Sequence, residues 1–305
     1  MSEHIRTRGD REGKAVEYPP APEPLPLPVF DNHTHLEIAD SALPLSVAEH
    51  LDRAAAVGVV GAVQVGTDVA TSRWSAEVAA REPRLLAAVA LHPNEAPALD
   101  AAGELDDALA VIDELAAQPR VRAIGETGLD AFRTGDDGRA AQFRSFEAHL
   151  DIAKRHGLAL QIHDRDAHDD VVATLRRVGA PERTVFHCFS GGQELAALAA
   201  DEGWYCSFAG NVTFKNAENL RDALRVVPRD RILVETDAPY LTPSPLRGRP
   251  NAPYLVPHTV RFMAEVLGTP LDELCAELAS NTVRVYGSWQ DEPVDVRRDE
   301  GPGGA

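Results

Sequence analysis

The residues of this sequence that are best suited to chemistry are histidines and carboxylates that each follow a short apolar run. His33 and His35 stand two apart after the first run, and residues two apart in a strand point to the same side. Such a pair alone is as compatible with two polar residues at a strand exit as with a metal site. The same placement recurs, however, after four later runs, at Glu126, His163, His187 and Asp237.

Four imidazoles and two carboxylates form a ligand set suited to borderline transition metals such as Zn, Mn, Fe, Co or Ni. Six ligands exceed a single catalytic zinc, which commonly takes three protein ligands and a water. Two ions that share a bridging carboxylate account for the surplus. Such a pair, roughly 3.5–4 Å apart, stabilises the entering and leaving oxygens of a displacement at phosphorus and lowers the pKa of a bound water. The set therefore predicts a two-metal hydrolytic centre.

Eight apolar runs separated by amphipathic stretches are predicted to position these side chains. Most are continuous rather than alternating, which is typical of parallel strands covered on both faces. The predicted strands are Val29–Asn32, Val59–Val65, Leu85–Leu91, Val121–Gly125, Leu158–Ile162, Thr184–Phe186, Trp204–Phe208 and Ile232–Val234. The alternation predicts an α/β fold of the (β/α)8 TIM-barrel type, with an open doubly wound sheet as the alternative. In a barrel the carboxyl ends of all strands converge on one face, where this architecture places its active sites.

The two ends of the chain are predicted to lie outside the barrel. Residues 1–28 become Pro-rich and favour a disordered, extended and solvated tail, and residues 288–305 form an acidic tail that ends in Gly-Pro-Gly-Gly-Ala. The barrel domain between them, residues 29–287, approaches the ~250 residues typical of this fold. Deletion of residues 1–28 is accordingly expected to leave activity unchanged.

Composition limits the partners. The chain has 305 residues and a net charge of -18, which disfavours bulk attraction to nucleic acid or anionic lipid. Three scattered cysteines do not suggest a disulfide framework. The first residues lack an apolar signal core, and no apolar run approaches the ~18 residues that span a bilayer. We expect a cytoplasmic protein with no membrane contact and no obligate protein partner.

The sequence resembles the TatD family of metal-dependent deoxyribonucleases, within the amidohydrolase-like barrel superfamily, over about residues 29–287. The motifs that carry the resemblance are Asp31-x-His33-x-His35, Leu91-His92-Pro93, Gly125-Glu126-Thr127-Gly128-Leu129-Asp130, Ile162-His163-Asp164-Arg165-Asp166-Ala167, His187-Cys188-Phe189-Ser190-Gly191 and Glu235-Thr236-Asp237-Ala238-Pro239-Tyr240-Leu241. One departure concerns substrate contact: Ala131-Phe132 stands where an aromatic pair is common in the family.

The resemblance implies roles for the six ligands around two divalent ions of the Mg, Mn or Zn class. His33, His35 and Asp237 would hold the first ion, and His163 and His187 the second. Glu126 would bridge the two, and Asp237 would also orient or deprotonate the attacking water. The implied catalytic residues are thus Asp237 and Glu126. The implied reaction is hydrolysis of a DNA phosphodiester from a strand end, and the acidic chain favours single-stranded or frayed ends as substrate.

Several neighbouring residues have two readings. His92 ends the third run, so it is predicted either to contact a substrate phosphate or to orient other site residues. Arg165 lies two residues beyond a ligand and is predicted either to clamp a phosphate or to pair with Asp130 or Asp166. Cys188 is expected to point away from the site and fill core space. The histidines in helical stretches are expected at the surface: His50, His149, His156, His168 and His258.

Two other functions compete with the nuclease. One is an amidohydrolase-type enzyme acting on an amide or ester such as an aminoacylated RNA, because fold and metal cage do not fix the substrate. Some relatives bridge their ions with a carboxylated lysine, but none of the three lysines here lies at the end of the fourth strand, which leaves Glu126 as the bridge. The other is a non-catalytic binding protein on a retired barrel, which the presence of all six ligands disfavours.

Overall fold

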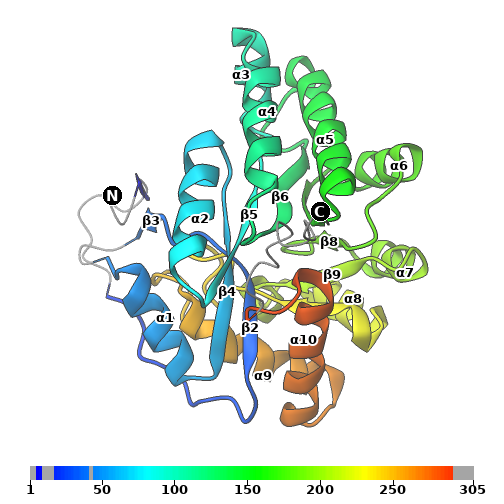
Figure 1. The fold of residues 1–305 in the computed structure, drawn as a ribbon. Helices are drawn as coiled ribbons and strands as arrows, with labels where there is room; N and C mark the ends of the chain where they lie inside the picture. Colours follow the sequence, from blue (N-terminus) through cyan, green and yellow to red (C-terminus); the bar gives the residue numbers. More distant parts are fainter. Residues whose placement is uncertain (1–4, 9–16, 41–43, 291–305) are drawn as a thin grey trace, which may run out of the picture.

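The structure is a computed structural model that describes residues 5–8, 17–40 and 44–290. Its centre is a parallel sheet of eight strands that curves into a nearly closed barrel (Figure 1). Neighbouring strands follow the order β10-β9-β8-β7-β6-β5-β4-β2. The strands are β2 (Val29–Thr34), β4 (Val59–Val65), β5 (Leu85–Val89), β6 (Val121–Asp130), β7 (Ala159–Arg165), β8 (Thr184–Phe186), β9 (Tyr205–Phe208) and β10 (Ile232–Val234). Each predicted strand is present, and the prediction of a TIM-type barrel is confirmed.

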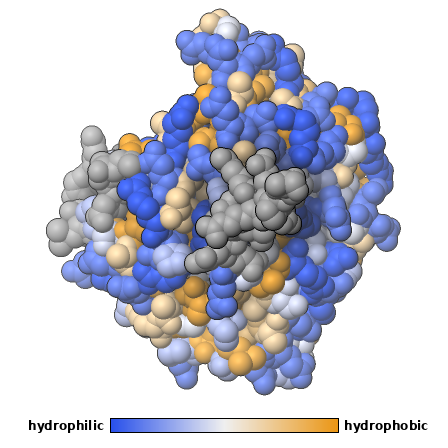
Figure 2. All heavy atoms as spheres, in the orientation of Figure 1, coloured by the Kyte–Doolittle hydropathy of each residue, from blue (hydrophilic) through white to orange (hydrophobic). Residues whose placement is uncertain are grey.

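Helices surround the barrel, and their apolar faces cover the outside of the strands (Figure 1). In the described residues they are α1 (Val47–Ala56), α2 (Val69–Arg81), α3 (Ala96–Ala102), α4 (Leu105–Ala116), α5 (Asp136–His156), α6 (His168–Val178), α7 (Gln193–Asp201), α8 (Glu218–Val226), α9 (Val256–Leu267) and α10 (Leu271–Tyr286). Helix α1 begins with a capping box, in which Ser46 and Glu49 each bond the other's backbone N–H. On the outer surface, hydrophilic residues predominate over the helices at the top and right of Figure 2. Among the described residues, no helix is both long enough and apolar enough to cross a membrane; the cytoplasmic location stays a prediction.

The barrel interior is a second, smaller core. Alternate strand residues such as Val63, Val65 and Leu86 point inward and are fully buried. At the amino-terminal ends of the strands this core is closed by Tyr286 and by Trp289, which stacks on Phe30 with ring centroids 4.3 Å apart. The six candidate ligands lie at the opposite mouth.

The first and last strands meet without a regular ladder. The Asn32 side chain donates to the Val234 carbonyl at 2.7 Å. Beyond the strands, Asp237 N donates to the His33 carbonyl at 2.9 Å, and His35 N donates to the Ala238 carbonyl at 2.8 Å. This seam places the end of the first strand beside the loop that follows the last one.

The predicted terminal tails are only partly outside the fold. Residues 17–28 are extended, as their prolines predict, but they pack against the barrel: Leu25 is buried, and the Pro19 carbonyl accepts from the Tyr254 hydroxyl at 2.5 Å. Disorder is therefore the wrong expectation for this stretch, because backbone carbonyls and one leucine find partners on the barrel surface. Trp289 is likewise packed. The remaining tail residues, 1–4, 9–16 and 291–305, lie outside the described residues.

Candidate metal centre

The structure brings the six predicted ligands together at one mouth of the barrel. Five of them are placed near or just beyond the carboxyl end of their strands, as expected for parallel strands that converge on one face, and Glu126 lies within β6 at a break in its register with β7. All but His33, which is completely buried, line a cavity of about 590 Å³.

The first group of ligands comes from the two strands that meet at the seam. His33 Nε2 and His35 Nε2 are 3.2 Å apart, and His35 Nε2 lies 3.6 Å from Asp237 Oδ1. The backbone of Asp237 has a φ of 54°, in the left-handed region. These three residues form one of the groups whose ligand atoms lie close enough together to hold a metal ion.

The second group surrounds one oxygen of Glu126. Glu126 Oε1 lies 2.7 Å from His163 Nδ1 and 2.9 Å from His187 Nε2. His92 Nε2 is 3.4 Å from the same oxygen, so His92 lies within this group rather than at its edge. His92, Glu126 and His163 form another group with the spacing of a metal site.

Glu126 lies between the two groups and turns one oxygen to each. Its Oε2 is 3.6 Å from His33 Nε2 and 3.7 Å from His35 Nε2, whereas Oε1 faces the second group. A carboxylate in this position can serve as a ligand to two ions at once.

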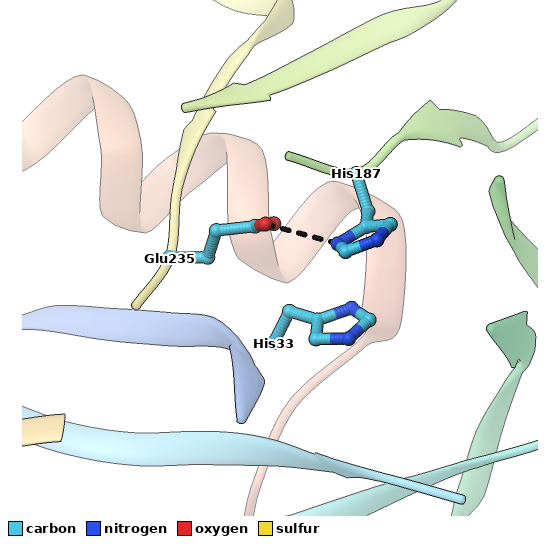
Figure 3. Close-up of side chains that lie close together, drawn as sticks. All are labelled: His33, His187 and Glu235. Atoms are coloured by element: carbon cyan, nitrogen blue, oxygen red, sulfur yellow. Dashed lines mark hydrogen bonds and ion pairs between the residues drawn. The ribbon is translucent and has the colours of Figure 1, made fainter. Parts of the chain in front are cut away.

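Two of the histidines, His35 and His187, are held in place through their second ring nitrogens. His35 Nδ1 lies 3.1 Å from the Val65 carbonyl, and His187 Nδ1 lies 3.0 Å from Glu235 Oε1. Figure 3 shows the Glu235 carboxylate directed at the His187 ring, which is stacked on His33 at 3.9 Å between centroids. Histidines that bind metals ordinarily donate their other ring N–H to a carboxylate or carbonyl in this way.

Burial and charge act against each other in the cluster. For His33, burial and the neighbouring His187 lower the pKa to about 3. Burial would also lower the pKa of His187, but the charges of Glu126 and Glu235 outweigh it and raise that pKa well above its usual value. Burial would raise the pKa of Glu126, but His187 and His92 hold it well below its usual range. Glu126 is therefore ionised, and the cluster favours cationic charge between its members.

The donor set fits divalent metal ions. It combines imidazole nitrogens with carboxylate oxygens, the ligands that Zn and Mn accept, and it includes no thiolate among the six. Within the described part of the chain, His33 Nδ1 and Glu235 Oε2 are buried without a hydrogen-bond partner. Buried polar atoms ordinarily have a partner, and an ion or a water molecule would supply one here.

Arg165 reaches the cavity from β7. Its guanidinium carbon lies 4.0 Å from the ring centroid of Phe132, whose side chain is 63% exposed although it is apolar. The cation–π contact holds the guanidinium of Arg165, a residue that lines the cavity.

Two expectations about other polar residues are wrong. Cys188 lines the cavity instead of the core, because its φ of 43° breaks the alternation of the preceding strand. His50 and His149 are buried rather than exposed, and His149 Nε2 accepts a hydrogen bond from Leu91 N at 3.0 Å. The other three helical histidines are half-buried.

Sequence reasoning missed several lining residues. Tyr240 and Asn211 line the cavity from loops after β10 and β9, and Arg6 reaches it from the amino-terminal segment. Tyr240 falls within a motif quoted above, but nothing in the sequence near Arg6 signals its position.

Comparison with known proteins agrees with this geometry. Residues 30–287 match the family described as TatD related DNase. The chain belongs to this family. An uncharacterized metal-dependent hydrolase TatD of Mycobacterium tuberculosis is 43% identical over 263 residues, which cover 85% of this chain and 98% of that protein. A protein of Escherichia fergusonii named 3'-5' ssDNA/RNA exonuclease TatD is 33% identical over 241 residues, covering 77% of this chain and 90% of that one.

A solved TatD homologue has the same fold. The crystal structure of YJJV from Escherichia coli K12 superposes with a TM-score of 0.76 at 28% identity, covering 85% of this chain and 98% of that chain. The resemblance to the TatD family is thereby confirmed. This TatD-family chain is a metal-dependent hydrolase acting on ester bonds, whereas the division into tails and barrel at residues 28 and 288 stays a prediction.

Proposed function

We propose that this TatD-family hydrolase uses two divalent ions to release nucleotides from an end of single-stranded DNA. The observation that supports it most is the position of Glu126, which turns Oε2 to one group of ligands and Oε1 to the other. The relative named as a single-strand exonuclease supports the substrate class.

The ligand assignment follows the two groups. His33, His35 and Asp237 would hold one ion, His163 and His187 the other, and Glu126 both. When bound, two such ions neutralise charge on a phosphodiester and make a nucleophile of water near neutral pH. Mn, Zn and Mg are the ions to test, because nitrogen ligands favour the first two and the oxygens also suit the third.

The protein's own residues then have distinct tasks. Asp237 is the more exposed of the two carboxylates, at 15% against 8%, and its side chain borders the cavity, so it is suited to orient and deprotonate the attacking water. Glu126 is enclosed by histidines and serves as the bridge. Arg165, with five N–H donors in a rigid fork, and His92 are suited to hold the phosphate.

The shape and charge of the protein favour a strand end. The cavity opens at one mouth and its floor is the filled barrel core, so a polymer enters from a single side. A net charge of -18 weakens long-range attraction to duplex DNA. We therefore expect cleavage of single strands and frayed ends with a shallow dependence on salt.

The test is an end-labelled oligonucleotide assay with the chelated protein reconstituted with Mn²⁺, Mg²⁺ or Zn²⁺. Single-stranded DNA, blunt duplex and single-stranded RNA are compared, alongside an aminoacylated RNA and a panel of amides and esters. Successive loss of nucleotides from one end of the single strand is expected. Turnover of acyl substrates without oligonucleotide cleavage would establish the amidohydrolase alternative instead.

The bridging role of Glu126 has its own control. Glu126→Ala is expected to lose activity by at least about 1,000-fold and to bind fewer ions per chain, with the melting temperature measured in chelator close to that of the unaltered protein. Glu194→Ala, on the exposed face of α7, is the matched control. Near-normal cleavage by the Glu126 variant under defined metal would refute the bridge.

A further inference from the structure

A short segment near the amino terminus reaches the active-site mouth. Residues Arg6–Thr7 (β1) pair in parallel with Ile38–Ala39 (β3), just beyond the end of β2. The backbone N–H of Ile5 donates to the Glu37 carbonyl at 3.1 Å, which continues this pairing. The pairing carries Arg6 to the rim of the barrel.

Arg6 lines the same cavity as the metal-centre histidines. Its Nη1 donates to Thr67 Oγ1 at 2.9 Å, and its Nη2 bonds the carboxylate of Asp68. The carbonyl of the same Thr67 accepts from His92 N at 2.8 Å, so Arg6 and the predicted phosphate contact share one neighbour. Arg165 lines the same cavity from β7, which is four strands from β2 in the barrel order.

A second arginine fixes the position of this segment. Arg8 Nη1 donates to the Pro239 carbonyl at 2.8 Å and lies 3.2 Å from Asp40 Oδ2. Its guanidinium also lies over the Tyr240 ring, 4.9 Å from the centroid. Pro239 and Tyr240 belong to the loop that carries Asp237, so the segment is tied to the site itself.

The contact between Arg6 and Asp68 does not by itself explain the arginine. Their side chains are 36% and 30% exposed, and ion pairs of this exposure contribute about 0–1 kcal/mol to stability. A guanidinium has five N–H donors, more than its contacts with Thr67 and Asp68 use. In a chain of net charge -18, an arginine held at a cavity with a metal centre is suited to a substrate anion.

We propose that Arg6 is a substrate-binding residue that binds a phosphate of the nucleic acid next to the one being cleaved. The inference rests on the proposed nuclease function. The family match begins at residue 30, so this contact is supplied from outside the matched region. It replaces the expectation that residues 1–28 are dispensable for activity.

The test compares Arg6→Ala with Arg73→Ala, which removes an exposed arginine from the outer face of α2. The first measurement is the dissociation constant of a fluorescent single-stranded pentanucleotide, by anisotropy in chelator, where no turnover occurs. The second is kcat/KM with Mn²⁺ on that pentanucleotide and on a nucleotide ester with one phosphate. We expect Arg6→Ala to raise the dissociation constant of the pentanucleotide about 10- to 100-fold and to lower kcat/KM mainly through a higher KM. The loss of kcat/KM is expected to be about tenfold larger on the pentanucleotide than on the ester.

The variant Asp68→Asn distinguishes substrate binding by Arg6 from a merely structural role of its ion pair with Asp68. It removes the charge that faces Arg6 while keeping an amide oxygen for the helix cap that Asp68 provides at Thr71 N. Binding close to that of the unaltered protein is expected for Asp68→Asn. An equal loss in both variants, or pentanucleotide affinity of Arg6→Ala within twofold of the Arg73→Ala control, would overturn the proposal. If the unaltered protein neither binds nor cleaves the oligonucleotide, the nuclease function itself fails.

Discussion

His149 is a buried histidine of α5, and its hydrogen bonds in the native fold require the neutral form of its imidazole. Its Nε2 accepts from Leu91 N at 3.0 Å, and its Nδ1 donates to the Ser145 carbonyl at 2.7 Å. A proton on Nε2 would remove the first of these bonds, and the fully buried side chain could not replace it with a bond to solvent. Burial accordingly lowers its pKa from 6.5 to about 4.

The lowered pKa of His149 makes the free energy of unfolding depend on pH, and this free energy falls as the pH falls. Between pH 6.5 and 4 the unfolded chain binds a proton that the native chain does not, so acid favours unfolding. Each pH unit in this window costs about 1.4 kcal/mol, which gives a loss of about 2 kcal/mol at pH 5 relative to pH 7.5. This contribution is complete above pH 6.5 and is lost as the pH falls towards 4.

The assay is urea unfolding at pH 7.5 and pH 5, in chelator, for the unaltered protein and for His149→Gln. Glutamine offers an amide oxygen to Leu91 N but does not titrate, so the difference between the two pH values is expected to shrink by about 2 kcal/mol. His156→Gln removes a half-buried histidine from the same helix and serves as the control. An unchanged pH difference in His149→Gln would show that this histidine does not link folding to protons.

Three further outcomes are expected. Glu235→Gln removes the carboxylate that positions His187, so kcat and metal affinity are both expected to fall about 10- to 100-fold, as measured by steady-state kinetics and metal titration. Values of both quantities close to those of the unaltered protein would contradict this role. Trp289→Ala removes the ring that stacks on Phe30, so the free energy of unfolding, measured in urea, is expected to fall by about 3 kcal/mol. Because the candidate ligands lie at the opposite mouth of the barrel, metal affinity measured by titration is expected to stay unchanged. Mn²⁺ added to the chelated protein at 100 times its dissociation constant is expected to stabilise it by about 2.7 kcal/mol in thermal unfolding, and no shift would mean that no ion binds the native state selectively.

The strands and the six candidate ligands could be predicted because both depend on local patterns. A parallel strand buried on both faces reads as a continuous apolar run, and a polar residue directly after it lies at the active face. The burial of His149 was also within reach, since it belongs to the helical stripe of Phe146, Leu150 and Ala153.

The remainder depends on contacts that no local pattern encodes. Arg6 lies in a strand of two residues, too short for a periodic signal, and its partner strand is about thirty residues away. Cys188 follows a strand whose alternation ends with a single left-handed residue. Residues 17–28 are held largely through backbone carbonyls, whose partners a sequence does not reveal.

The seam between β2 and β10 makes the candidate metal centre depend on residues from both ends of the barrel sequence. Asp237 follows the last strand of the barrel, and its backbone N–H donates to the carbonyl of His33 on the first strand. A chain that ends before β10 thus carries five of the six ligands but lacks Asp237 and the seam that positions it.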